Sequence, residues 1–146
     1  MEYAIENEYL IVTVTTWGAQ VKSVVRKFDD VEHMWQADKS VWGYHAPILF
    51  PHTGKVVDDL IETKGEVYQA KQHGFARLME HTLVRQTEDT IVMELRSSEE
   101  TLRIFPYAFR LVSTFTLDGD TLHHKLTVEN WDADKLYFGI GYHPAF

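Results

Sequence analysis

A two-residue alternation of apolar and polar side chains constrains this chain most, because it is the periodicity of a β-strand. The alternation is clearest in Phe109–Leu117 and Leu122–Glu129, with Asp118-Gly119-Asp120 between them. A glycine flanked by aspartates between two such runs is typical of a tight hairpin turn. We therefore expect these two runs to pair as antiparallel strands.

Similar short runs occur along the rest of the chain, many of them separated by polar turn signals such as Asp29-Asp30 and Glu88-Asp89. Many short strands joined by tight turns favour an all-β fold, a sandwich or barrel of antiparallel sheets. No repeat, low-complexity tract or flexible linker divides the chain, so residues 1–146 are expected to form part of one domain. The other strand candidates are 10–15, 21–25, Val31–Trp35, Val67–Ala70, Thr82–Gln86, Ile91–Leu95 and Leu136–Ile140.

One segment predicts helix instead of strand. Ser97-Ser98-Glu99-Glu100 matches a capping box, with serine at the cap and glutamate three residues later. Phe105-Pro106 ends the pattern, because proline disfavours helical geometry in the residue before it. A connector of one or two helical turns is expected between residues 97 and 104.

Charge and cysteine content exclude several classes of function. The chain has 22 acidic and 14 basic residues, a net charge of −8, which opposes a nucleic-acid partner because phosphates require a basic face. The absence of cysteine excludes disulfides, thiolate chemistry and sulfur-ligated metals, and fits a reducing compartment. No signal-peptide pattern and no membrane-spanning apolar stretch occurs, so we expect a cytoplasmic protein without a membrane partner.

Three motifs follow one another along the chain. They are Pro47-Ile48-Leu49-Phe50-Pro51 with Gly54, then His73-Gly74-Phe75-Ala76-Arg77, and finally Gly141-Tyr142-His143-Pro144-Ala145-Phe146. In this order they resemble the aldose 1-epimerase (galactose mutarotase-like) family, and most closely its LacX-type and hexose-6-phosphate mutarotase-like members. The resemblance implies an antiparallel β-sandwich, the galactose mutarotase-like supersandwich, of which residues 1–146 correspond to the N-terminal half.

Interconverting the anomers of an aldose requires opening its hemiacetal ring. A base removes the proton of the anomeric hydroxyl while an acid protonates the ring oxygen, and histidine titrates in the range that suits the acid. The resemblance implies that His143 is this acid and that His73 binds and places the substrate. The family's base is a glutamate downstream of the His-Pro motif, and no glutamate of this chain occupies that position. No cofactor is implied.

Further binding residues are implied by the same motifs. In the sugar-phosphate members the arginine that matches Arg77 helps to hold the phosphate, which suits the planar guanidinium. Lys55 and His45 stand where relatives often carry arginine, and these departures weaken a phosphate-sugar assignment. Trp42, Tyr44 and Phe75 are candidates either for stacking on the apolar face of a sugar or for the core.

Three functions remain open at this point. The first is an isomerase that acts on an aldose or hexose phosphate, with its base in a C-terminal half. The others are a carbohydrate-binding β-sandwich without turnover and an inactive fragment. No metal is expected, because the remaining histidines lack partners at ligand spacing. A half-sandwich leaves strand edges and apolar residues uncovered, so self-association or docking of a missing half is also expected.

Overall fold

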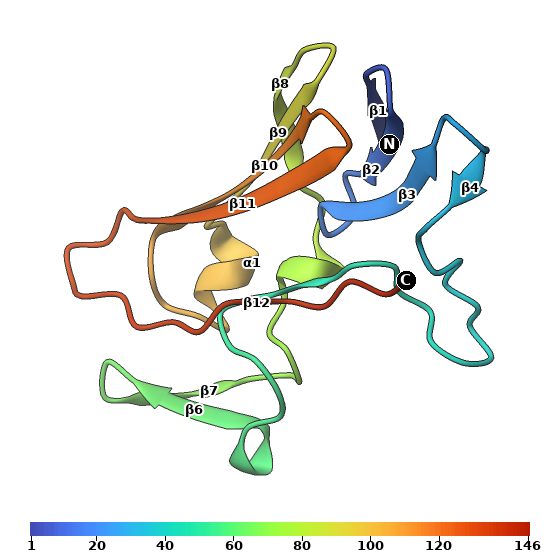
Figure 1. Cartoon of the computed structure of the whole chain (residues 1–146). Helices are drawn as coiled ribbons and strands as arrows, with labels where there is room; N and C mark the ends of the chain where they lie inside the picture. Colours follow the sequence, from blue (N-terminus) through green and yellow to red (C-terminus); the bar gives the residue numbers. More distant parts are fainter.

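The computed structural model describes residues 1–146 and is built from antiparallel sheets with very little helix (Figure 1). One four-stranded sheet has the order β1-β2-β3-β4 and the other has the order β11-β10-β9-β8, while β12-β5 and β6-β7 form two-stranded sheets. The predicted all-β fold is confirmed. The strands are β1 (Glu2–Glu6), β2 (Leu10–Thr15), β3 (Gln20–Arg26), β4 (Val31–Glu32), β5 (Ile48–Leu49), β6 (Leu60–Thr63), β7 (Glu66–Gln69), β8 (Thr82–Gln86), β9 (Thr90–Arg96), β10 (Phe109–Asp118), β11 (Thr121–Asn130) and β12 (Gly141–Tyr142).

The two larger sheets share one apolar core. Alternate residues of β2, β9 and β10 point inward, so their side chains join a single buried cluster. Aromatic rings fill the part of this cluster to which the first and second sequence motifs contribute, with ring centroids 5.1–6.2 Å apart. Such pairs add to the stabilisation that burial alone provides. The rings belong to Phe50, Phe75, Phe105 and Phe109.

The predicted β10–β11 hairpin is present. Asp118 pairs with Thr121, which leaves Gly119-Asp120 as a two-residue loop, and Gly119 has a φ of 57°. A positive φ at this place is common in two-residue hairpin loops, whose twist matches that of the strands.

One strand prediction was too long and another was wrong. Only β4 forms within Val31–Trp35, because the Glu32 carboxylate accepts the backbone N–H groups of Met34 at 2.8 Å and Val24 at 2.9 Å, in place of further ladder bonds. Leu136–Ile140 is not a strand: its Gly139 N–H donates to the Pro51 carbonyl at 2.8 Å, but the pairing becomes a regular strand only at Gly141.

The helix begins one residue later than the capping-box pattern predicted. Helix α1 (Glu99–Leu102) is capped by Ser98, whose hydroxyl accepts the Thr101 N–H at 3.3 Å while the Thr101 hydroxyl accepts the Ser98 N–H at 2.8 Å. Ser97 cannot be the cap because its N–H still bonds the Phe109 carbonyl of the sheet at 3.0 Å. Short 3-10 turns at Val57–Asp59 and Ala76–Leu78 lie outside the predicted helical segment. None of these helices is long and apolar enough to cross a bilayer.

Several large apolar side chains lie at the surface. Phe28 is 93% exposed, Phe146 is 85% exposed and Val57 is 83% exposed, and β11 is an edge strand of its sheet. Uncovered edges and apolar patches favour association. Coverage of this surface by another half or a second copy stays a prediction.

Asp132, in the loop after β11, forms an ion pair at 2.9 Å with Lys64 in the turn of the β6–β7 hairpin. We expect Asp132→Asn to lower the melting temperature near neutral pH. Backbone N–H groups of Asp134 and Ala108, and then Lys64, hold the pKa of Asp132 at about 2, below its ordinary 3.8. A lowered pKa means that the stabilisation is complete above pH 3.8 and is lost as the pH falls toward 2. The difference in melting temperature between the two proteins should therefore shrink over that range.

Asp134→Asn is the matched control, because Asp134 contacts the same lysine at 3.1 Å but its side chain is 69% exposed. Thermal melts of both variants followed by circular dichroism should show a much smaller effect for Asp134→Asn. Equal effects would mean that Asp132 contributes only an exposed ion pair.

Candidate active site

The first and third sequence motifs lie side by side in the structure. Strand β5 pairs antiparallel with β12, so that Ile48 lies opposite Tyr142 (Figure 1). The pairing continues beyond the strands, because the His143 N–H donates to the Pro47 carbonyl at 3.1 Å and the Ala145 N–H donates to the His45 carbonyl at 3.0 Å. The backbone of His143 is therefore held by residues from the first third of the chain.

The second motif joins them through Gly74. Phe50 and Gly74 form a parallel bridge, and the Phe75 N–H donates to the Phe50 carbonyl at 2.9 Å. Gly74 has a φ of 69°, and a Cβ at this position would lie 2.1 Å from the Phe50 oxygen. Only glycine permits this approach, which places the neighbouring His73 next to the first motif.

His73 is held as a neutral hydrogen-bond donor. The Gly54 N–H donates to its Nδ1 at 2.9 Å, so the neutral ring carries its proton on Nε2. Burial, followed by the positive charges of Arg77, His143 and His52, lowers the pKa of His73 below its ordinary 6.5. A protonated ring would also set its Nδ1–H against the Gly54 N–H. The Nε2 of His73 lies 3.3 Å from the exposed side-chain amide of Gln72, which a ligand oxygen would replace as the partner of this nitrogen.

Arg77 lies at the end of the same segment with part of its guanidinium unused. Its Nη2 donates to the Gln72 carbonyl at 2.9 Å, and its Cζ lies 5.0 Å from the centre of the Tyr44 ring. The Nε atom is buried and has no hydrogen-bond partner. A buried donor without a partner costs free energy, so this guanidinium is suited to receive an acceptor such as a phosphate or carboxylate oxygen.

His143 is exposed, and its imidazole packs against Trp42 with ring centroids 4.9 Å apart. Its side chain makes no hydrogen bond in the structure. The charges of Arg77 and His143 both contribute to the lowered pKa of His73.

The structure does not link His45 and Lys55 to these three residues. His45 Nδ1 lies 2.7 Å from the Trp35 carbonyl, to which it donates, so the ring is committed to the backbone on that side. Lys55 follows Gly54, but its side chain is 68% exposed and its ion pair is with Asp59 at 3.9 Å. Their binding roles stay predictions that no contact to His73 supports.

The aromatic candidates divide into two kinds. Phe75 is 8% exposed and belongs to the phenylalanine cluster of the core. Trp42 and Tyr44 are half-buried and contact His143 and Arg77, respectively. Sequence reasoning did not find that Gly54 and Gln72 hold His73 and Arg77, because the Gly54 contact and the Arg77 contact use backbone atoms that any residue carries.

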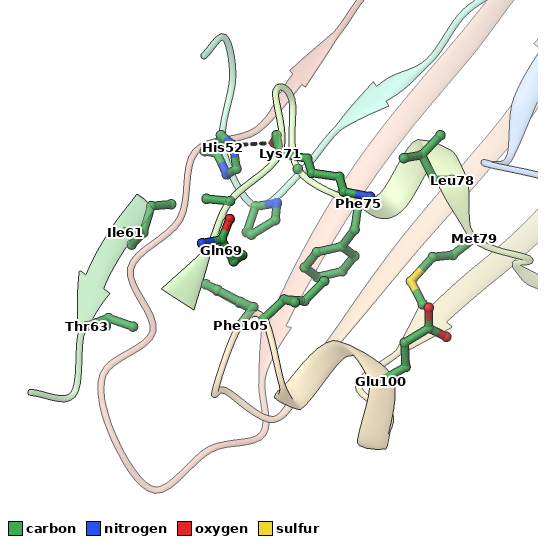
Figure 2. A pocket seen from close by; sticks show the side chains of 14 residues that line it. His52, Ile61, Thr63, Gln69, Lys71, Phe75, Leu78, Met79, Glu100 and Phe105 are labelled. Carbon is green, nitrogen blue, oxygen red and sulfur yellow. Dashed lines mark hydrogen bonds between the residues drawn. The ribbon is translucent and has the colours of Figure 1, made fainter. Parts of the chain in front are cut away.

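A cavity of about 320 Å³ opens on another side of the second motif, between β6, α1 and the segment that follows Gly74. Figure 2 shows Phe75 and Phe105 facing each other in it, with Ile61 and Thr63 on the β6 side. His52 lies at one end, where its Nε2 is 2.9 Å from the Lys71 carbonyl. The walls are mostly apolar, and His73, Arg77 and His143 do not line this cavity.

Comparison with known proteins places the chain in a family. Residues 1–146 match the family Aldose 1-epimerase. Protein LacX of Lactococcus lactis subsp. lactis is 35% identical over 153 residues, which cover 100% of this chain and 50% of LacX. A galactose mutarotase related enzyme from Lactobacillus acidophilus has a TM-score of 0.97 and 36% identity, over 99% of this chain and 48% of that one. A galactose mutarotase-like protein from Lactobacillus casei ATCC 334 has a TM-score of 0.95 and 33% identity, over 99% and 49%.

The chain thus spans about half the length of these relatives, which agrees with the half-sandwich expected from its motifs. The fold of that half is the galactose mutarotase-like β-sandwich, as the TM-score of 0.97 shows. From its fold and from the match over residues 1–146, the chain belongs to the aldose 1-epimerase family.

Proposed function

We propose that this chain supplies the acid and much of the substrate-binding surface of an aldose 1-epimerase. His143 gives a proton to the ring oxygen of the sugar as the bond from that oxygen to the anomeric carbon breaks. A base takes the proton of the anomeric hydroxyl, whose oxygen becomes the aldehyde oxygen. Rotation of the aldehyde and the reverse proton transfers close the ring on its other face. The reaction transfers protons and breaks and re-forms the bond between the ring oxygen and the anomeric carbon. No atom is oxidised or reduced overall, so no cofactor is required.

One observation carries this proposal. The pairing of β12 with β5, and the bridge between Phe50 and Gly74, bring the segments of His143 and of His73 and Arg77 against the same first motif. His73 presents an Nε2–H donor that is fixed by Gly54, which suits a hydroxyl or ring oxygen of a sugar. A donor, a cation and an exposed imidazole in one neighbourhood are what acid-assisted ring opening needs.

The base is proposed to come from the part of the longer relatives that this chain does not match. His73 contacts Gly54 and Gln72, Arg77 contacts Gln72 and Tyr44, and His143 packs against Trp42, so no carboxylate is among these contacts. Without a base the anomeric proton cannot be removed in step with protonation of the ring oxygen. Residues 1–146 alone are therefore proposed to bind a sugar without accelerating its mutarotation.

A carbohydrate-binding sandwich without turnover is the second candidate, and it is favoured because no carboxylate is among the contacts of His73, Arg77 and His143. The test joins residues 1–146 to the C-terminal half of the Lactobacillus acidophilus relative. Polarimetry on freshly dissolved α-glucose, α-galactose and a phosphorylated aldose then measures turnover by the chimera. Acceleration of at least one of them is expected, whereas binding without acceleration would favour the second candidate.

Arg77 should determine how well a phosphorylated aldose is used. Arg77→Lys keeps the positive charge but loses the planar fork and the contact with the Tyr44 ring. We expect the KM of the chimera for the phosphorylated sugar to rise about tenfold, the order that one or two charge-assisted hydrogen bonds contribute. The KM for the unphosphorylated sugar should change less. An equal rise for both sugars would contradict a phosphate-binding role.

A further inference from the structure

Four planar side chains form a continuous ladder across the candidate site. The Arg77 guanidinium lies over the Tyr44 ring at 5.0 Å. Tyr44 packs against Trp42 with ring centroids 5.7 Å apart and an angle of 50° between the rings. Trp42 in turn packs against His143 at 4.9 Å and 49°. The ladder therefore connects the proposed anion-binding group to the proposed acid.

Trp42 stands on a backbone that is fixed to the backbone of His143. The Trp35 indole N–H donates to the Trp42 carbonyl at 2.8 Å, and the Trp35 N–H donates to the Ala145 carbonyl at 3.0 Å. On the other side of His143, its own N–H donates to the Pro47 carbonyl at 3.1 Å. Trp35 thus links the segment that carries the indole to the segment that carries the imidazole.

The His143 imidazole depends on ring packing for its orientation more than the side chains of His73 and Arg77 do. His73 is oriented by the Gly54 N–H, and Arg77 is oriented by the Gln72 carbonyl. The His143 side chain is exposed and lacks a hydrogen bond to either ring nitrogen. Packing against Trp42 is the one ring contact that restricts its rotation.

We propose that Trp42 is a positioning residue for His143, which holds the imidazole in the orientation from which it can reach the ring oxygen of the sugar. Tyr44 packs against the indole of Trp42 and also contacts the Arg77 guanidinium. The ladder therefore sets the distance between His143, the proposed acid, and Arg77, the proposed anion-binding group. This inference rests on the proposed function. A misplacement of about 1 Å can cost about 100-fold in rate, so a ring contact can matter without touching the substrate.

The contact itself can be tested in the 146-residue chain, without any activity. The ring current of the indole should displace the proton NMR signals of the His143 imidazole, which the spectrum of His143→Asn identifies by their loss. Trp42→Leu should return these signals toward those of a free histidine, whereas Trp42→Phe should keep most of the displacement. Trp131→Leu is the control, since Trp131 packs against Arg96 and not against His143. Far-UV circular dichroism verifies that each variant is folded.

The positioning role is tested in the chimera with the C-terminal half of the Lactobacillus acidophilus relative. Trp42→Leu should lower kcat about tenfold to 100-fold, while KM stays within about threefold because binding contacts are retained. Trp42→Phe should remain within about threefold of the unsubstituted chimera, and Trp131→Leu should equal it.

The possible failures are distinct. Histidine signals that Trp42→Leu does not move would show that the contact is absent and would overturn the inference. Moved signals with an unchanged kcat, or a rise in KM alone, would overturn the positioning role. A chimera that never accelerates mutarotation, with the NMR contact intact, would contradict the proposed function, and the positioning role would fall with it.

Discussion

Gly74→Ala should be the most damaging single methyl addition in the chain. A Cβ at this position would lie 2.1 Å from the Phe50 oxygen, 2.4 Å from the Phe50 carbonyl carbon and 2.7 Å from Pro51 Cδ. None of these atoms is the end of a flexible side chain, so the backbone must move. The left-handed φ costs about 1–2 kcal/mol and the overlap about 1–3 kcal/mol, which together lower the free energy of unfolding by about 2–5 kcal/mol.

Gly65→Ala separates these two costs. Gly65 has a φ of 77°, but a Cβ there would meet nothing within 4 Å. Urea unfolding followed by circular dichroism should therefore give about 1–2 kcal/mol for Gly65→Ala. If Gly74→Ala lowers the free energy of unfolding no more than Gly65→Ala does, the close approach of Phe50 and Gly74 does not exist. The position of His73 beside the first motif would then lack its support.

His143→Asn should abolish most of the catalysis in the chimera. Asparagine keeps the approximate size and a hydrogen-bond donor but has no proton to transfer at neutral pH. General acids contribute about 10²–10⁴-fold, so the rate of mutarotation should fall at least about 100-fold. His73→Asn removes mainly positioning and should raise KM at least as clearly as it lowers kcat.

His33→Asn is the control for both substitutions, because His33 is an exposed histidine next to β4 and outside the candidate site. Polarimetry on the same sugars should give the unsubstituted rate for this variant. A loss of less than about threefold for His143→Asn would remove His143 from the proton transfer, since acids contribute far more than this.

Strands with a buried face could be predicted because their two-residue periodicity follows the pleat, and Phe109–Leu117 falls one residue short of β10. Thr82–Gln86 coincides with β8, although no residue of this edge strand is buried. Strands β1 and β6 were missed, as were the two-residue strands β5 and β12. Two residues carry no periodicity, so these strands exist only through the tertiary pairing of distant motifs.

The candidate site was predictable to the same limited degree. The motifs identified His73, Arg77 and His143, and the structure brings their segments together. The motifs could not show that the Phe50 carbonyl receives the Gly74 segment or that Trp42 packs against His143. These contacts depend on the path of the backbone and on side chains that meet across the chain, which a linear pattern does not specify.

The central claim is that residues 1–146 hold the proposed acid but not the base. Mutarotation by the 146-residue chain alone tests this claim most directly. The measurement is the optical rotation of freshly dissolved α-glucose, α-galactose or a phosphorylated aldose, compared with the spontaneous rate. The chain should give only the spontaneous rate, and His143→Asn should change nothing, because we propose that the base acting with His143 lies outside these residues. Rapid mutarotation that His143→Asn abolishes would show that a base lies within residues 1–146. The claim that these residues hold the acid without the base would then be wrong.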